Sequence, residues 1–117
     1  MALLEEPIRD VIQLKNLVDG DWVSSSGPSA DVVNPATGQP IARVPISTAE
    51  EFDDAVKAAN LAFPEWRRTP PLARVRCLFR LKELMEQHFE ELSRIQTMEH
   101  GKTIDESRGE TRRGIEN

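Results

Sequence analysis

The stretch PIARVPISTAEEFDDAV, residues 40–56, changes from a strand pattern to a helix pattern within one short segment. Up to Ile46 apolar residues alternate with small or polar ones, which predicts a half-buried strand. From Ser47 onward the apolar residues recur at helical spacing, which predicts an amphipathic helix. We therefore expect a mixed α/β fold, with strands in roughly residues 16–46 and helices after them.

Two short β-hairpins are predicted before this change. In the first, Asp19-Gly20 separates the apolar runs 14–18 and 21–23, because a tight hairpin turn needs the positive φ that Gly and Asp tolerate. Hairpins this short are marginal alone and need another surface to pack on. Residues 1–13 have no strong pattern, and we expect a loose or weakly helical lead-in before a domain segment that covers residues 14–117.

The second predicted hairpin surrounds the turn Asn34-Pro35-Ala36-Thr37-Gly38. Asp31–Val33 and Pro40–Ile46 are its two strands. Asn-Pro favours the opening of a turn, and Gly38 can adopt the left-handed backbone that closes it. A Ser/Gly/Pro loop over residues 24–29 is expected to join the two hairpins.

The first of four predicted helices begins at a capping box, in which a hydroxyl binds a free backbone amide and a carboxylate returns the bond. Ser47 with Glu50 and Thr48 with Glu51 both fit this pattern. Pro64 is expected to end the helix or to bend it near its last turn, because proline lacks an amide hydrogen.

The other three helices are also marked by their ends. Thr69, before two prolines, is the expected cap of the second helix. The third runs from about Glu90 to His100 and stops at Gly101, with Leu92, Ile95 and Met98 turned inward. Thr103 and Glu106 form a capping box for the fourth, which is expected to be still running at Asn117.

Composition excludes several classes of function. The net charge of −5 lacks the basic excess that nucleic-acid binding needs. No apolar run approaches the roughly 20 residues of a membrane span. The start of the chain is too acidic for a transit peptide and has no signal-peptide pattern. The one cysteine allows no intramolecular disulfide, so a cytoplasmic location is expected.

One local segment is basic. Residues 66–82 hold six cations and no acid. Charge runs usually mark a solvated helix face, and we favour a solvated or intersubunit face over a phosphate or nucleic-acid site.

No group of residues has the pattern of a reaction centre. The sequence contains no GxGxxG or Walker-type glycine loop. His88 and His100 do not form a metal-ligand spacing with Cys77, and both fit helix ends, where cations are favoured. Cys77 lies within the apolar second helix and is expected to be a buried small hydrophobic residue. We expect no catalytic residue, no cofactor-binding residue and no metal ligand in this chain.

Four motifs in order resemble the aldehyde dehydrogenase family. They are Lys15–Val23 (KNLVDGDWV), Asn34–Gly38 (NPATG), Ala62–Trp66 (AFPEW) and Glu99–Thr103 (EHGKT), the last with His100 where the family usually has Asn or Gln. The resemblance covers residues 14–117 and implies part of an α/β NAD-binding domain, with NAD as cofactor. It also implies that the catalytic cysteine, the general-base glutamate and the cofactor-loop glycines lie downstream of Asn117. We therefore expect a truncated, partial or excised chain that is inactive alone.

Two further motifs are similar to the methylmalonate-semialdehyde dehydrogenase branch of that family: Arg43–Thr48 (RVPIST) and Gly109–Asn117 (GETRRGIEN). The resemblance implies oxidation of malonate or methylmalonate semialdehyde to acetyl-CoA or propionyl-CoA, as in valine catabolism. CoA would be a co-substrate, and the full-length enzyme would be a homo-oligomer, a dimer or a tetramer. A non-acylating semialdehyde dehydrogenase and a stand-alone helical module that docks its apolar face on a partner are the alternatives.

In that branch the arginine of the RGIEN motif is implicated in holding the substrate carboxylate, a role that would fall on Arg113. A guanidinium can bind a carboxylate through two parallel hydrogen bonds, which both attracts and orients it. The alternative is a surface arginine that pairs with Glu110 or Asn117 at helical spacing. Arg112 would face a different side of the same helix.

Overall fold

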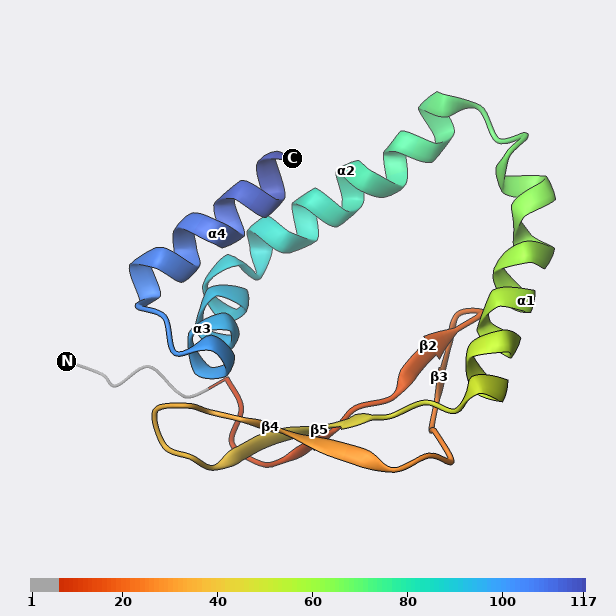
Figure 1. Cartoon of the computed structure of the whole chain (residues 1–117). Coiled ribbons are helices and arrows are strands. Elements are labelled where there is room, and N and C mark those ends of the chain that lie inside the picture. The colour runs from red at the N-terminus through yellow and green to blue at the C-terminus, as the bar shows by residue number, and fades with distance from the viewer. Residues whose placement is uncertain (1–6) are drawn as a thin grey trace.

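The computed structural model describes residues 7–117 as an open arch of helices standing on two small sheets (Figure 1). The molecule extends over 52 × 37 × 20 Å, with a radius of gyration of 17.5 Å. A compact domain of this length has a radius of gyration of about 13 Å. Strands and helices are both present, so the predicted mixed α/β class is confirmed. No helix among the described residues is long and apolar enough to cross a membrane.

The first predicted hairpin is present. Strands β2 (Asn16–Val18) and β3 (Asp21–Val23) pair antiparallel as a two-stranded sheet. Asp19 and Gly20 between them have φ values of 52° and 85°, the positive values that a tight hairpin turn requires.

The second predicted hairpin is also present, and it belongs to a three-stranded sheet. Strand β4 (Ser29–Val33) pairs antiparallel with β5 (Pro40–Pro45). In the turn between them the Asn34 side chain accepts a hydrogen bond from the Ala36 amide at 2.9 Å. Gly38 has a φ of 71°, so its left-handed backbone closes the turn as expected.

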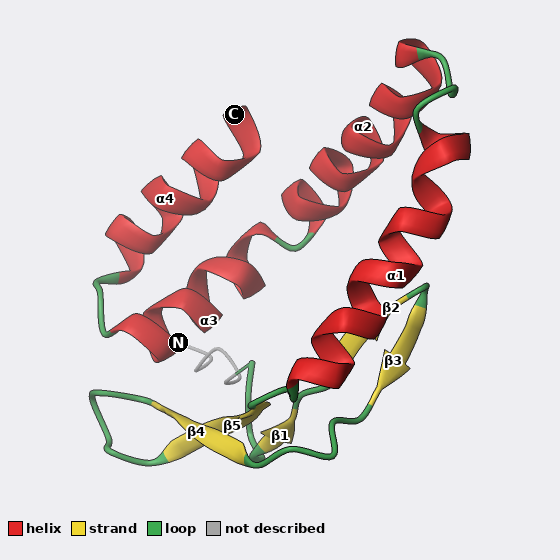
Figure 2. Cartoon of the chain, turned by 45° about the vertical axis from the view of Figure 1, so that its right-hand side comes forward, coloured by secondary structure: helices red, strands yellow, loops and turns green. Residues whose placement is uncertain are grey.

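Strand β1 (Ile12–Gln13) corrects the prediction for the lead-in (Figure 2). It pairs parallel with the free edge of β5, which gives the strand order β1-β5-β4. A two-residue strand has no periodicity of its own, and its partner lies 30 residues later, so no local pattern marks it. The first six residues of the predicted lead-in lie outside the described residues.

Helix α1 (Ala49–Trp66) begins at the second of the two predicted capping boxes. The Glu51 amide donates to the Thr48 hydroxyl at 3.2 Å, and the Thr48 amide donates to the Glu51 carboxylate at 3.1 Å. The helix continues two residues past Pro64, so Pro64 does not end it.

The prediction that Thr69 caps helix α2 (Pro71–Gln87) is wrong. Pro70 occupies the cap position without a side-chain hydrogen bond. The Thr69 hydroxyl instead donates back to the Glu65 carbonyl of the preceding helix, at 3.1 Å. The Thr69 hydroxyl is therefore bound to the last turn of α1 and does not cap α2.

The last two helices follow their predicted limits. Helix α3 (Phe89–His100) ends at Gly101, whose φ of 76° is the left-handed cap. Helix α4 (Ile104–Glu116) starts at the predicted box of Thr103 and Glu106, and the Asn117 amide still donates to the Arg113 carbonyl, so the helix continues to the last residues as expected.

Very little apolar surface is buried. Among the described residues the buried hydrophobic side chains are Ile41, Ala42 and Ile115. Of the residues expected to point inward on α3, Leu92 is 37% exposed and Ile95 and Met98 are half-buried. The large apolar side chains of α1 and α2 are mostly exposed: Phe52, Val56, Leu61, Phe63, Trp66, Leu72, Leu78, Phe79, Leu81 and Leu84. The predicted apolar faces exist, but the described residues do not cover them.

Glu51 joins the loop that follows β3 to the start of α1. Its carboxylate accepts hydrogen bonds from the Ser25 hydroxyl at 2.6 Å and from the Ser26 amide at 2.7 Å, in addition to the capping bond. These bonds, first that of Ser25 and then that of Ser26, lower the pKa of Glu51 from 4.5 to about 2. The ionised carboxylate is thus the form that holds the loop on the helix.

We predict that Glu51→Gln, in a full-length protein containing this segment, lowers the thermal unfolding midpoint at pH 7. Because the folded pKa lies below the unfolded one, the contribution of Glu51 is present above pH 4.5 and is lost as the pH falls towards 2. Thermal unfolding from pH 7 to pH 3 should therefore show the difference between variant and parent shrinking below about pH 4.5. Glu50→Gln, one residue earlier, is the control, because among the described residues it is Glu51 whose carboxylate bonds the loop after β3. A difference that stays constant over this range would contradict the assignment.

Candidate functional site

Helix α4 carries Arg113 and packs on α3 through one face. The buried residues of α4 are Ser107, Thr111 and Ile115, spaced four residues apart. Thr111 meets Ser93, the buried residue of α3, and Ser107 meets Thr97. Residues at this spacing lie above one another on a helix, so they form a single contact stripe. Their spacing is the one sequence signal that points to these polar residues, which were not predicted to be buried.

Hydroxyl groups pair across the two helices in two places. The Ser93 and Thr111 hydroxyl oxygens lie 3.2 Å apart, and the Thr97 hydroxyl donates to that of Ser107 at 2.8 Å. Ser93 also donates to the Phe89 carbonyl at 2.8 Å. Buried polar groups need such partners, since an unsatisfied hydroxyl costs about 1–3 kcal/mol.

Ion pairs flank the contact between the two helices on the solvent side. The Arg108 guanidinium holds the Glu90 carboxylate at 2.8 and 3.0 Å, which lowers the pKa of Glu90. Lys102 and Gln96 both donate to the Glu110 carboxylate, and the Lys102 bond is the main reason that the pKa of Glu110 is lowered. Glu110 is therefore already engaged from two sides.

Arg113 lies exposed near the end of α4. Glu110, one of its two expected alternative partners, is bound by Lys102 and Gln96 instead. Asn117, the other, bonds Arg113 only through the backbone, at 3.2 Å. Within residues 7–117 no ion pair or side-chain hydrogen bond involves the Arg113 guanidinium. The alternative surface pair is thus not formed.

Arg112 occupies a different side of the helix, as expected. Its guanidinium lies over the Phe89 ring, 4.6 Å from the ring centroid, and so contacts the start of α3. Such a cation–π contact contributes about 0.5–1 kcal/mol at an exposed site. The two neighbouring arginines therefore differ in role: one contacts the fold and the other projects from it.

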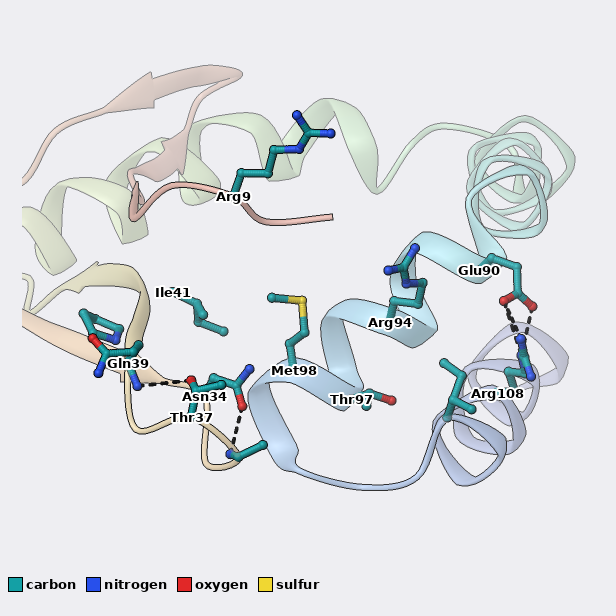
Figure 3. A pocket seen from close by; sticks show the side chains of 13 residues that line it. Arg9, Asn34, Thr37, Gln39, Ile41, Glu90, Arg94, Thr97, Met98 and Arg108 are labelled. Carbon is teal, nitrogen blue, oxygen red and sulfur yellow. Dashed lines mark hydrogen bonds and ion pairs between the residues drawn. The ribbon is translucent and has the colours of Figure 1, made fainter. Parts of the chain in front are cut away.

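Two hollows border this helix pair. The first, of about 700 Å³, lies between the β4–β5 turn and α3, where Arg9, Arg94, Met98 and Ile41 line it (Figure 3). The second, of about 580 Å³, lies between α2 and the end of α4. Its lining is largely apolar: Val75, Leu78, Phe79, Leu81, Lys82, Met85, Gly114, Ile115, Glu116 and Asn117. A Cβ atom added at Gly114 would meet nothing within 4 Å, so the backbone beside Arg113 is open.

Cys77 is exposed, which corrects the prediction that it is buried. The helix periodicity placed it in an apolar segment, but no described residue covers that part of α2. His88 caps the junction of α2 and α3, and His100 is the last residue of α3, so both stand at helix ends as predicted. No group of three or more His, Cys, Asp or Glu within residues 7–117 could hold a metal ion.

In the basic segment, two cations pair with acids on their own helix. Arg80 binds Glu83, and Lys82 binds Glu86. Such pairs are typical of a solvated helix face, which was the favoured interpretation of this segment over a phosphate or nucleic-acid site.

Residues 22–117 match the family model described as the aldehyde dehydrogenase family. The chain belongs to the aldehyde dehydrogenase family. One relative is malonate-semialdehyde dehydrogenase 2 of Geobacillus kaustophilus, which is 52% identical to this chain over 104 residues. The matched region is 88% of this chain and 22% of that protein. The malonate-semialdehyde dehydrogenase of Pseudomonas aeruginosa is 45% identical and is covered over 21% of its length.

Solved aldehyde dehydrogenase structures share this arrangement of strands and helices. The methylmalonate-semialdehyde dehydrogenase of Oceanimonas doudoroffii superposes with a TM-score of 0.85 at 42% identity, over 91% of this chain and 22% of that one. A Sinorhizobium meliloti protein assigned to the same activity and crystallised with NAD gives a TM-score of 0.85 at 33% identity, over 92% of this chain and 22% of that one. The chain thus spans about a fifth of the length of the relatives it matches.

Proposed function

We propose that this chain is the N-terminal part of an NAD-dependent semialdehyde dehydrogenase, and that it contributes substrate recognition without the reaction centre. The full enzyme would oxidise malonate or methylmalonate semialdehyde to acetyl-CoA or propionyl-CoA, with CoA as the acyl acceptor. Identities of 52% and 45% to two malonate-semialdehyde dehydrogenases support this substrate class. A non-acylating semialdehyde dehydrogenase, with water as the acceptor, is the nearest alternative.

The described residues do not fit a dinucleotide site of their own. Helix N-termini bind phosphate through free backbone amides. The amide ends of α1 and α4 are already occupied by their capping boxes. Helix α2 begins with Pro70-Pro71, which have no amide hydrogen to donate, and the first turn of α3 carries Glu90 and Glu91, which disfavour an anion. We therefore propose that NAD is held by residues outside this chain, as are the nucleophilic thiol and the general base.

The exposed Arg113 guanidinium is the single observation that carries the substrate assignment. Glu110, three residues earlier on the same helix, is bound by Lys102 and Gln96, and no ion pair within residues 7–117 involves Arg113, so its guanidinium is left able to bind an external carboxylate. The guanidinium would attract the acid group of the semialdehyde and orient it through two parallel hydrogen bonds. The other end of the substrate, the aldehyde, would then point towards the reaction centre.

We also propose that the full-length protein is a cytoplasmic homo-oligomer, a dimer or a tetramer. The extensive apolar surface of α1 and α2 supports contacts beyond the described residues, within the same polypeptide or between subunits.

We predict that Arg113→Ala, in a full-length enzyme containing this segment, raises KM for malonate semialdehyde roughly 10- to 100-fold, because a charge-assisted hydrogen bond is lost. Steady-state kinetics with malonate semialdehyde and with an aldehyde of similar size without a carboxylate would measure this. Arg112→Ala is the matched control, since that arginine contacts Phe89. Any change that it causes in KM should be equal for the two substrates. If Arg113→Ala raises KM equally for both substrates, the assignment is wrong.

The rival function is a stand-alone helical module, which the exposed apolar face of α2 favours. We predict instead that the purified 117-residue chain unfolds over a broad temperature range and binds a hydrophobic dye, because it buries little apolar surface. Calorimetry and dye fluorescence would test this. A cooperative melt of a monomer would favour the module. A reading frame that continues past Asn117 into a cysteine-containing catalytic region would favour the enzyme.

A further inference from the structure

We infer that the paired hydroxyls between α3 and α4, Thr111 above all, are positioning residues that set the direction in which Arg113 projects. This inference rests on the proposed function of Arg113. It concerns residues that touch neither substrate nor cofactor and act only through the placement of α4.

The hydroxyl pairs form two rungs that are one helical turn apart. Ser93 faces Thr111, and Thr97 faces Ser107, so the rungs are separated by four residues on each helix. Ser93 and Ser107 are fully buried, and Thr111 is 9% exposed. These three are the buried polar residues of the part of the chain that the structure describes.

Two rungs fix the rotation and the axial position of α4 more strictly than apolar packing would. A shift by one residue moves a helix by about 1.5 Å and turns it by about 100°, which would separate both hydroxyl pairs. Apolar burial has no such directionality, and Ile115 is the one buried apolar residue on the contact face of α4. The register of α4 on α3 is therefore held by the hydroxyls at the buried centre of the contact, together with the exposed Arg108–Glu90 and Gln96–Glu110 bonds at its margin.

The rotation of α4 decides where the Arg113 guanidinium lies. Arg113 follows Thr111 by two residues and so projects about 200° around the helix, away from the rungs. At the outer radius of a helix, about 5–6 Å, a 20° rotation of α4 moves the Arg113 side chain by about 2 Å. Two parallel guanidinium–carboxylate bonds require distances of about 2.7–2.9 Å, so they do not tolerate such a movement.

Thr111→Val tests the inference, because valine keeps the shape of threonine and removes the hydroxyl. In a full-length enzyme containing this segment, we expect KM for malonate semialdehyde to rise about three- to tenfold, less than the 10²-fold that a 1 Å misplacement can cost. The kcat, and both constants for an aldehyde without a carboxylate, should stay roughly unchanged. Thr111→Ser, which restores the hydroxyl, should restore KM.

Two further variants complete the test. Thr97→Val removes the other rung and should give the same selective rise in KM. The inference can therefore be tested even if Thr111→Val does not fold. Thr69→Val is the matched control, since its hydroxyl bonds the Glu65 carbonyl at the end of α1, and it should leave the ratio of the two KM values unchanged.

The double variant Arg113→Ala/Thr111→Val separates this inference from the proposed function. If the hydroxyl acts through Arg113, Thr111→Val adds no further loss of selectivity in the Arg113→Ala background. If Arg113→Ala changes selectivity but neither rung variant does, the inference is wrong and the proposed function stands. If Arg113→Ala leaves selectivity unchanged, the proposed function itself fails. Equal losses on both substrates from the rung variants would show a purely structural role and overturn the inference.

Discussion

Apolar side chains on α1 and α2 find no covering surface among the described residues, and this shortage of burial governs the rest of the structure. Phe52, Leu61, Leu72 and Phe79 are all more than half exposed, while three apolar side chains within residues 7–117 are buried. Burial of apolar surface is the main favourable term in folding, so a segment like this depends on contacts with protein outside it. The open arch in Figure 1 is the shape that results when helices keep the positions they have in a larger family fold.

Polar contacts provide the local order that the small core cannot. The Thr48–Glu51 and Thr103–Glu106 boxes fix where α1 and α4 begin. Glu51 also holds the loop after β3, and the hydroxyl rungs hold α4 on α3. Each of these contacts joins segments by directional bonds, so the geometry of this part of the family fold is specified even where apolar packing is thin.

This division suits the role in substrate recognition that is proposed for the segment. A residue that selects a carboxylate needs a fixed position and a free charge. The ion pairs on the solvent side of α3 and α4 occupy Glu90 and Glu110, and they leave the Arg113 guanidinium without a carboxylate partner among residues 7–117. The relatives are more than four times longer than the matched segment, which is consistent with the proposal that the reaction centre and the cofactor site lie outside it.

The sequence by itself determined the features that depend on near neighbours. Asp19-Gly20, the two capping boxes and Gly101 each act within a few residues, so both hairpins and the limits of α3 and α4 were predictable from them. Features that depend on distant partners were not. Strand β1 forms by pairing with the edge of β5, 30 residues later. The Thr69 hydroxyl bonds the last turn of α1, and the exposure of Cys77 depends on what covers α2. Only the tertiary structure decided that small hydroxyl residues are buried between α3 and α4, because the neighbouring sequence does not show which partner such a hydroxyl will meet.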